Sequence, residues 1–156
     1  MNDPNNPNAS NDPNDLHRRC DAIEESYEFM LAYAAQGLSG DAASQSSGQL
    51  RDYLTRAVTA LEKIGDVLRA AIERNRLEPA DRYRTYADLL DRDARDAQAS
   101  IELVLAQSSI SSQLVDNLNA SVHVRKMLTD LFLIDEILAP QVITSVGGSP
   151  SRAAPQ

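Results

Sequence analysis

The residues of this sequence that could do chemistry gather in two places, and the first lies near the N-terminus. Five side chains of metal-ligand type recur there at helical spacing: His17, Cys20, Asp21, Glu24 and Glu28. In a helix they share one side, and imidazole, thiolate and carboxylate groups all bind metals. Metal sites in helical bundles, however, draw ligands from facing helices, often as Glu-x-x-His pairs, and no such pair occurs in the sequence.

We therefore expect no metal site and no cofactor. The favoured interpretation is that Cys20 packs as a small hydrophobe while the charged residues around it line a solvated helix edge. A metal-binding helical bundle that uses these ligands stays open as an alternative function.

The second place is the segment SVHVRKM, residues 121–127, in which His123 precedes Lys126 by three. A His-x-x-Lys pattern on a bundle helix resembles the phosphorylatable histidine of histidine-phosphotransfer domains, which are also small, acidic, four-helix proteins. That family's pattern has a glycine after the lysine, where this sequence has Met127. The resemblance implies a signalling bundle with His123 as phosphoacceptor, which needs an exposed, neutral imidazole nitrogen. We keep it as an alternative to an ordinary surface histidine.

Other catalytic patterns do not occur. The sequence has no glycine-rich phosphate loop, no GxSxG motif and no pair of cysteines. Serines cluster at 44–47 and 108–112, but neither cluster has a histidine nearby to act as a base. We therefore expect a protein that is not an enzyme.

Composition limits the class of partner and the compartment. The chain has 156 residues, about one domain, and its net charge is −8. Such an acidic chain is a poor match for nucleic acid or anionic lipid, so a charged partner should be basic. The single cysteine suits a reducing compartment. Residues 1–15 lack the basic and apolar regions of a signal peptide, and no apolar run reaches membrane-spanning length, so we expect neither export nor a membrane span. We expect a cytoplasmic protein of bacterial type.

The two ends differ from the middle. The sequence NDPN occurs at residues 2–5 and again at 11–14, and the C-terminal segment is rich in Gly, Ser and Pro. Such segments bury too little apolar surface to offset the entropy of ordering. We predict a disordered tail at 1–14, a flexible tail at 140–156 and a helical domain at 15–139.

Apolar residues within the domain recur at steps of three and four, which predicts four helices. The first runs from about Asp15 to Gln36. The second follows a loop and a possible capping box of Ser46 and Gln49, with a coiled-coil-like seam from Leu50 to Ala71. The third begins near Pro79 and reaches Leu105, and the fourth spans Leu114 to Leu138 before Pro140.

Short connections favour antiparallel neighbours, so the predicted fold is an all-α, antiparallel four-helix bundle. One alternative depends on QSSISS at 107–112. If that segment is helical, the third and fourth helices merge into one long rod that must pack in a dimer. The charged stretch at 91–98 is interpreted as a solvated face with the ion pairs Asp91–Arg95 and Arg92–Asp96.

Surplus apolar surface is the main indication of function. Residues 27–37 and the segment LFLIDEIL at 131–138 hold more apolar side chains than one contact stripe requires. We predict a helical interaction protein, such as an adaptor, assembly factor or regulatory partner, that binds another protein through an apolar patch with an acidic rim. A homodimer is the default use of such a patch. The predicted partner-binding residues are Phe29, Tyr33, Leu131, Phe132 and Leu133.

Overall fold

The computed structural model describes the backbone of residues 12–146 and the side chains of residues 12–139. Most of the two predicted tails, at 1–11 and 147–156, lies outside the described residues. The described chain is all-helical, as predicted, and contains no strand. Its six helices are α1 (Asp15–Ala35), α2 (Gly40–Leu61), α3 (Ile64–Asn75), α4 (Ala80–Leu105), α5 (Ser112–Ala120) and α6 (Val122–Val146).

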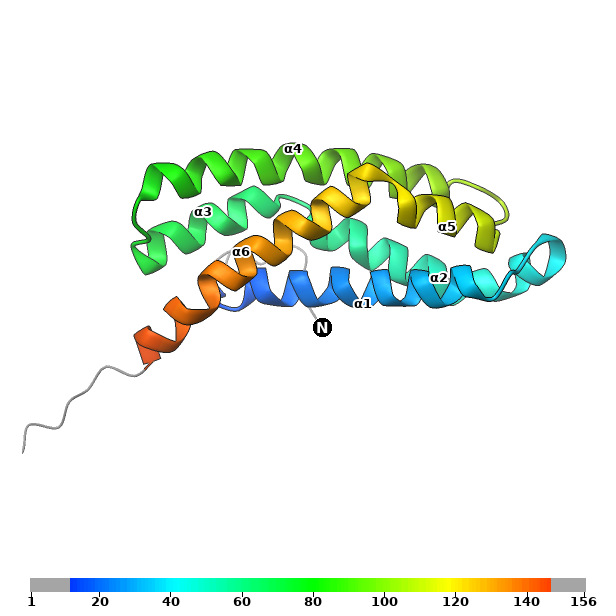
Figure 1. Ribbon diagram of the computed structural model, residues 1–156, viewed down its shortest axis with the longest axis horizontal. Helices are drawn as coiled ribbons and strands as arrows, with labels where there is room; N and C mark the ends of the chain where they lie inside the picture. The colour runs from blue at the N-terminus through cyan, green and yellow to red at the C-terminus, as the bar shows by residue number, and fades with distance from the viewer. Residues whose placement is uncertain (1–11, 147–156) are drawn as a thin grey trace, which may run out of the picture.

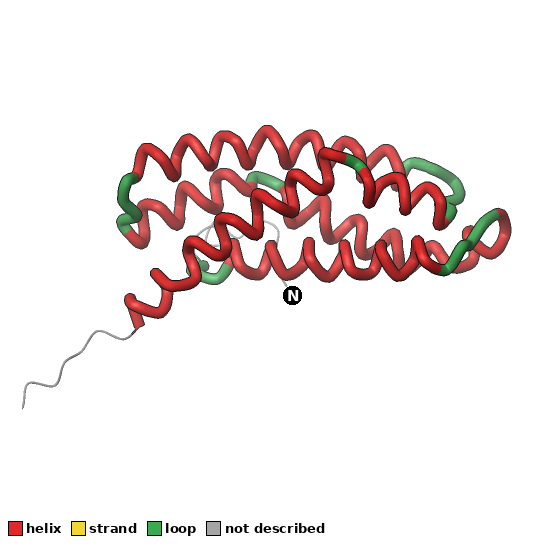
Figure 2. Tube along the Cα trace, viewed as in Figure 1, coloured by secondary structure: helices red, strands yellow, loops and turns green. Residues whose placement is uncertain are grey.

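Six helices form where four were predicted because two of the expected helices are divided. The predicted second helix becomes α2 and α3, and the predicted fourth becomes α5 and α6. Figure 2 shows both divisions as short loops between helical segments. In Figure 1, α2 and α3 follow one another alongside α1 and α4, whereas α6 crosses obliquely and its C-terminal end extends beyond α1.

Two distant side chains fix the division between α2 and α3. The Arg19 guanidinium of α1 donates to the carbonyls of Ala60, at 3.1 Å, and Glu62, at 2.6 Å, which are orphan acceptors at the end of α2. The Asp91 carboxylate of α4 accepts from the amide of Gly65 at 2.8 Å, at the start of α3. A side chain at position 65 would overlap that carboxylate, so the cap requires glycine. The continuous coiled-coil seam was therefore wrong.

The division between α5 and α6 falls at Ser121, whose ψ of 129° leaves the helical region. The carbonyl that this break frees on Asn119 accepts a hydrogen bond from the Arg125 Nε at 3.2 Å. Arg125 thus supplies the orphaned end of α5 with a donor from the first turn of α6.

The third and fourth predicted helices are separate, so the merged rod is ruled out. The helix does not continue beyond α4 because the backbone carbonyls at its end accept hydrogen bonds from side chains of other helices. Arg51 of α2 donates to the carbonyls of Leu105, at 2.8 Å, and Gln107, at 2.6 Å. Tyr33 donates its hydroxyl to the carbonyl of Ile110 at 2.7 Å, and the Ile110 side chain is fully buried.

Two helix ends also differ from the prediction. α2 begins at Gly40, so Ser46 and Gln49 lie inside the helix and form no capping box. α6 continues through Pro140 to Val146, although an end near residue 139 was predicted. Proline removes one backbone donor, but its fixed φ is compatible with a helix, so the chain can continue at the loss of one hydrogen bond.

The core runs the length of the described domain. Its largest fully buried side chains include Leu50 and Leu54 of α2, Leu68 of α3 and Leu90 of α4. None of the helices between residues 12 and 146 is both long and apolar enough to cross a lipid bilayer.

Candidate functional site

Three of the large apolar side chains that are exposed among the described residues lie close together in the sequence of α6. We call Phe132, Leu133 and Ile137 the α6 surface; their exposed fractions are 45%, 53% and 42%. Leu133 and Ile137 are four residues apart and therefore share one side of α6, whereas Phe132 lies about 100° around the helix from Leu133. Contiguous exposed apolar side chains on a soluble domain mark a contact site more often than single scattered ones do.

A groove of about 250 Å³ adjoins the α6 surface. Its α6 wall contains Leu133, Ile134 and Ile137, and its other wall is the beginning of α4, with Pro79, Arg82, Tyr83 and Tyr86. The Tyr86 hydroxyl donates to the Asp130 carbonyl at 2.8 Å, which ties the floor of the groove to α6. The groove can accept apolar side chains of a partner helix.

The charges near the groove have both signs. Arg82 lines the groove, whereas the exposed Glu136 precedes Ile137 on α6. Neither residue forms an ion pair with another described residue. The purely acidic rim that the composition suggested is therefore corrected to a mixed one at this position.

The predicted partner-binding residues divide between surface and core. Phe132 and Leu133 are exposed, as a contact role requires. Tyr33 and Leu131 are in the core, with exposed fractions of 2% and 1%, so their assignment to a binding surface is corrected. Phe29 is partly buried and stacks on Tyr53, with ring centroids 4.4 Å apart, so a neighbouring helix already covers one of its faces.

Of the groove residues, only Leu133 was predicted as a site residue; those that were missed are Pro79, Arg82, Tyr83, Tyr86, Ile134 and Ile137. Tyr83 and Tyr86 were assigned to the core stripe of the third helix because their spacing continues it. They are instead half-buried at the edge of that stripe. The residue type could have indicated this position at the edge of the core. A tyrosine hydroxyl needs a polar neighbour or water even where its ring packs.

His123 is exposed at the beginning of α6. Its neighbour Lys126, three residues on, donates to the Asp93 carboxylate of α4 at 2.8 Å. Exposure is compatible with a phosphoacceptor, but the lysine of the pattern has a structural partner. Phosphate acceptance by His123 stays a prediction.

The N-terminal ligand-type residues do not come together as a metal site. Cys20 is buried, and burial raises the pKa of its thiol to about 12, so the thiolate that binds metals is strongly disfavoured. His17 lies 3.2 Å from Asp135 of α6 and 3.5 Å from Asp21, and its hydrogen bond to Asp135 raises its pKa. Among the described residues, no three His, Cys, Asp or Glu side chains are placed to hold a metal ion.

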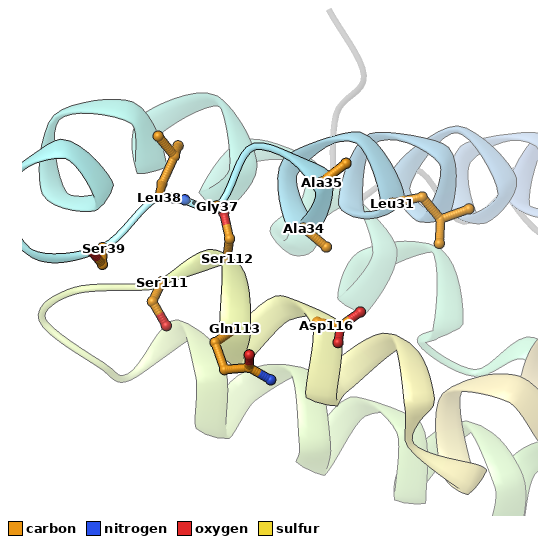
Figure 3. Close-up of a pocket in the computed structure, with 10 residues that line it drawn as sticks. All are labelled: Leu31, Ala34, Ala35, Gly37, Leu38, Ser39, Ser111, Ser112, Gln113 and Asp116. Carbon is orange, nitrogen blue, oxygen red and sulfur yellow. Dashed lines mark hydrogen bonds between the residues drawn. The ribbon is translucent and has the colours of Figure 1, made fainter.

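A second pocket, of about 530 Å³, lies where the end of α1 meets the beginning of α5. Figure 3 shows Gln113 and Asp116 of α5 across from Leu31 and Ala34 of α1. Its central polar group already has partners, because the Ser112 hydroxyl donates to the Tyr33 carbonyl at 2.7 Å and accepts from the Leu38 amide at 2.8 Å. These bonds hold the loops together, and we assign the pocket a structural role.

A buried pair of carboxyl groups joins α4 and α6. Asp93 is only 5% exposed, and its Oδ1 accepts from Lys126. The carboxyls of Asp93 and Asp130 lie within hydrogen-bond reach of each other. The Oδ2 atom of each is buried and has no donor among the described residues. Neither of the two ion pairs predicted for residues 91–98 forms among the described residues, and Asp91 instead pairs with Arg69 of α3 at 2.9 Å.

Asn119, at the end of α5, is buried, and its side-chain amide has no hydrogen-bond partner on either atom among the described residues. We expect Asn119→Leu to raise the free energy of unfolding by about 1–3 kcal/mol, because an apolar side chain of similar size removes the unpaired polar group. Urea denaturation measures the change. Asn117→Leu, at an exposed position of the same helix, is the control and should change stability by about 0.5 kcal/mol or less. A destabilised Asn119→Leu protein would show that the amide is satisfied in solution.

Comparison with protein-family models, curated proteins and solved structures finds no match to this chain. The α6 surface and its groove therefore have to be interpreted from the chain's own residues.

Proposed function

We propose that the chain is a non-enzymatic helical interaction protein that pairs with a second copy of itself through the α6 surface and the adjoining groove. The observation that carries the proposal is the exposure of Phe132, Leu133 and Ile137 beside an apolar groove. In this proposal each divided helix is treated as one unit, α2 together with α3 and α5 together with α6. With α1 and α4, these units form an antiparallel bundle of four. A cytoplasmic, reducing setting is supported by the buried free thiol of Cys20.

The mixed charge around the groove favours a second copy over an unrelated partner. A two-fold axis brings each contact into the interface twice, so Arg82 of each copy can meet Glu136 of the other. The α6 side chains of one copy then fill the groove of the other. The apolar contacts contribute most of the affinity, and the two exposed ion pairs contribute mainly register.

A basic helix from another protein is the competing occupant, and ionic strength separates the two. The net charge of −8 repels a second copy, so added salt should strengthen or preserve self-pairing. The same salt should weaken binding of a basic partner, because it screens the attraction between opposite charges.

Replacing Leu133 by glutamate is expected to shift the protein to monomer, because it places a charge in the apolar contact. Sedimentation equilibrium from about 1 to 200 µM, the range in which weak pairs dissociate, measures the effect as a rise of about tenfold or more in the dissociation constant. Leu103→Glu is the matched control. Leu103 is 68% exposed on α4 and does not line the groove, so this variant should pair like the original protein.

A charge exchange tests the two-fold arrangement itself. Arg82→Glu and Glu136→Arg should each weaken pairing, and the double variant should restore it, because the opposite charges meet again. An original protein that stays monomeric over the whole range, or a Leu133→Glu variant that pairs unchanged, contradicts the proposal.

A further inference from the structure

The carboxyl pair between α4 and α6 places two acidic groups in a buried position, where a negative charge on both is strongly unfavourable. Asp93 and Asp130 lie within hydrogen-bond reach, and their Oδ2 atoms are both buried without another donor among the described residues. Two negative charges so close together repel strongly, whereas one proton between them makes a strong, charge-assisted hydrogen bond. We infer that Asp93 and Asp130 share one proton, and that this proton controls how firmly α6 packs on α4.

The surroundings assign the proton to Asp130. The Lys126 ammonium lies 2.8 Å from the Asp93 Oδ1 and keeps that carboxyl ionised. The hydrogen bond from Asp130 and then the charge of Lys126 hold the pKa of Asp93 below its ordinary value. Burial first, then the hydrogen bond to Asp93 and the Asp93 charge, raise the pKa of Asp130 to about 7. Protonated Asp130 therefore donates to ionised Asp93.

The other charged groups around the pair do not replace this proton. Two other residues of α4 act at longer range. The charge of Arg92 lowers the pKa of Asp93, and the charge of Asp96 raises the pKa of Lys126. Tyr86 keeps its hydroxyl proton, because burial and the two aspartates raise its pKa to about 12. A divalent cation is a weaker alternative, since Lys126 already supplies a positive charge and the described residues provide no third ligand.

The pair connects to the groove through Tyr86. This residue lines the groove and donates its hydroxyl to the backbone carbonyl of Asp130. Loss of the shared proton would leave two facing carboxylates directly behind that contact, with one ammonium group between α4 and α6 to offset them. The packing of α6, and with it the shape of the groove, thus becomes sensitive to pH near neutrality. The inference concerns a single chain and does not depend on pairing.

The direction of the pH effect follows from linkage. The pKa of Asp130 is about 7 in the folded protein and 3.8 when unperturbed, so between these values the folded state binds more protons than the unfolded state. Its contribution to stability is full below pH 3.8 and is lost as the pH rises through about 7. Asp93 has the opposite effect on stability, because its pKa is lowered. That effect occurs below pH 3.8, outside the pH range of the test.

One other described group titrates in the same direction and has to be removed first. His17, on α1, has a raised pKa because of Asp135 of α6, so its contribution is also lost as the pH rises. The sequence has only two histidines, His17 and His123. The background for the test is therefore the double variant His17→Gln/His123→Gln, which contains no imidazole.

In that background, we expect the melting temperature to fall by about 3–8 °C between pH 5 and pH 8 and to level off above it. Adding Asp130→Asn should abolish the fall, because the amide donates to Asp93 at every pH. Glu102→Gln, which removes an exposed acid of α4 that does not line the groove, should leave the fall intact. Carboxyl ¹³C shifts give a second readout, in which the Asp130 signal should titrate near pH 7.

A melting temperature independent of pH in the imidazole-free protein overturns the inference. So does an Asp130→Asn variant that keeps the fall, or an Asp130 signal that titrates near pH 4. If Asp130→Asn does not fold, the carboxyl shifts of the imidazole-free protein decide alone. A protein that shows the titration yet never pairs supports the shared proton and contradicts only the proposed function.

Discussion

Leu131→Ala is expected to lower the free energy of unfolding by about 2–5 kcal/mol, whereas Phe132→Ala should cost about 1 kcal/mol or less. Leu131 is fully packed in the core, so its truncation leaves a cavity, while its neighbour Phe132 is almost half exposed. Urea denaturation of dilute protein measures both changes. The loss for Leu131 should appear at every protein concentration, because it occurs within one chain.

The comparison of these neighbours separates core from contact surface on the same helix turn. Phe132→Ala should instead raise the dissociation constant of the pair while the helical spectrum stays unchanged. Equal losses of stability in the two variants would contradict this division of roles on α6.

The second large effect is expected at Tyr33, whose truncation to alanine should cost about 3–5 kcal/mol. The ring is buried, and its hydroxyl donates to the carbonyl of Ile110, so the side chain holds the loop between α4 and α5 against α1. Thermal or urea unfolding measures the loss. Hydrogen exchange in residues 106–111 should also rise, because that loop loses its main anchor.

Tyr33→Phe is the matched control for the hydroxyl. It keeps the ring and removes one donor, so we expect a loss of about 1–3 kcal/mol from the unpaired Ile110 carbonyl. If Tyr33→Ala folds as stably as the original protein, Tyr33 is not a core residue and its original assignment to a binding surface has to be restored.

The helices could be predicted from sequence, but their divisions could not. Apolar spacing reports which side of a helix is buried, and it continues through residues 61–64 without interruption. The groups that end α2 and begin α3 belong to Arg19 and Asp91, far away in the sequence. A cap that another helix supplies is not visible in the sequence around the helix end. The only local trace of it here is the glycine at position 65.

The candidate site could be predicted only as a segment. Residues 131–138 are apolar on most sides, which correctly indicated a surplus, but a wide apolar arc does not say which of its edges a neighbour covers. Leu131 and Phe132 are adjacent in sequence and differ completely in burial. That difference arises from the oblique crossing of α6 over the other helices, which Figure 1 shows.

The buried carboxyl pair was missed for a related reason. Asp93 stands in a run of alternating acidic and basic residues, which usually marks a solvated face. Its burial depends on α6 lying over α4, with Lys126 and Asp130 at matching height. Such a juxtaposition depends on the packing of two helices and has no signature in either one.

Direct observation of contacts between two copies tests whether the α6 surface is a pairing surface. In an equal mixture of isotope-labelled and unlabelled protein, isotope-filtered NMR detects only contacts between different chains. We expect such contacts from Phe132 and Leu133 of one copy to Tyr83 and Tyr86 of the other. The expectation is contradicted if the contacts involve the other exposed large apolar positions of the described residues, Leu31, Leu103 or Val122. The absence of any contact between copies would contradict it as well.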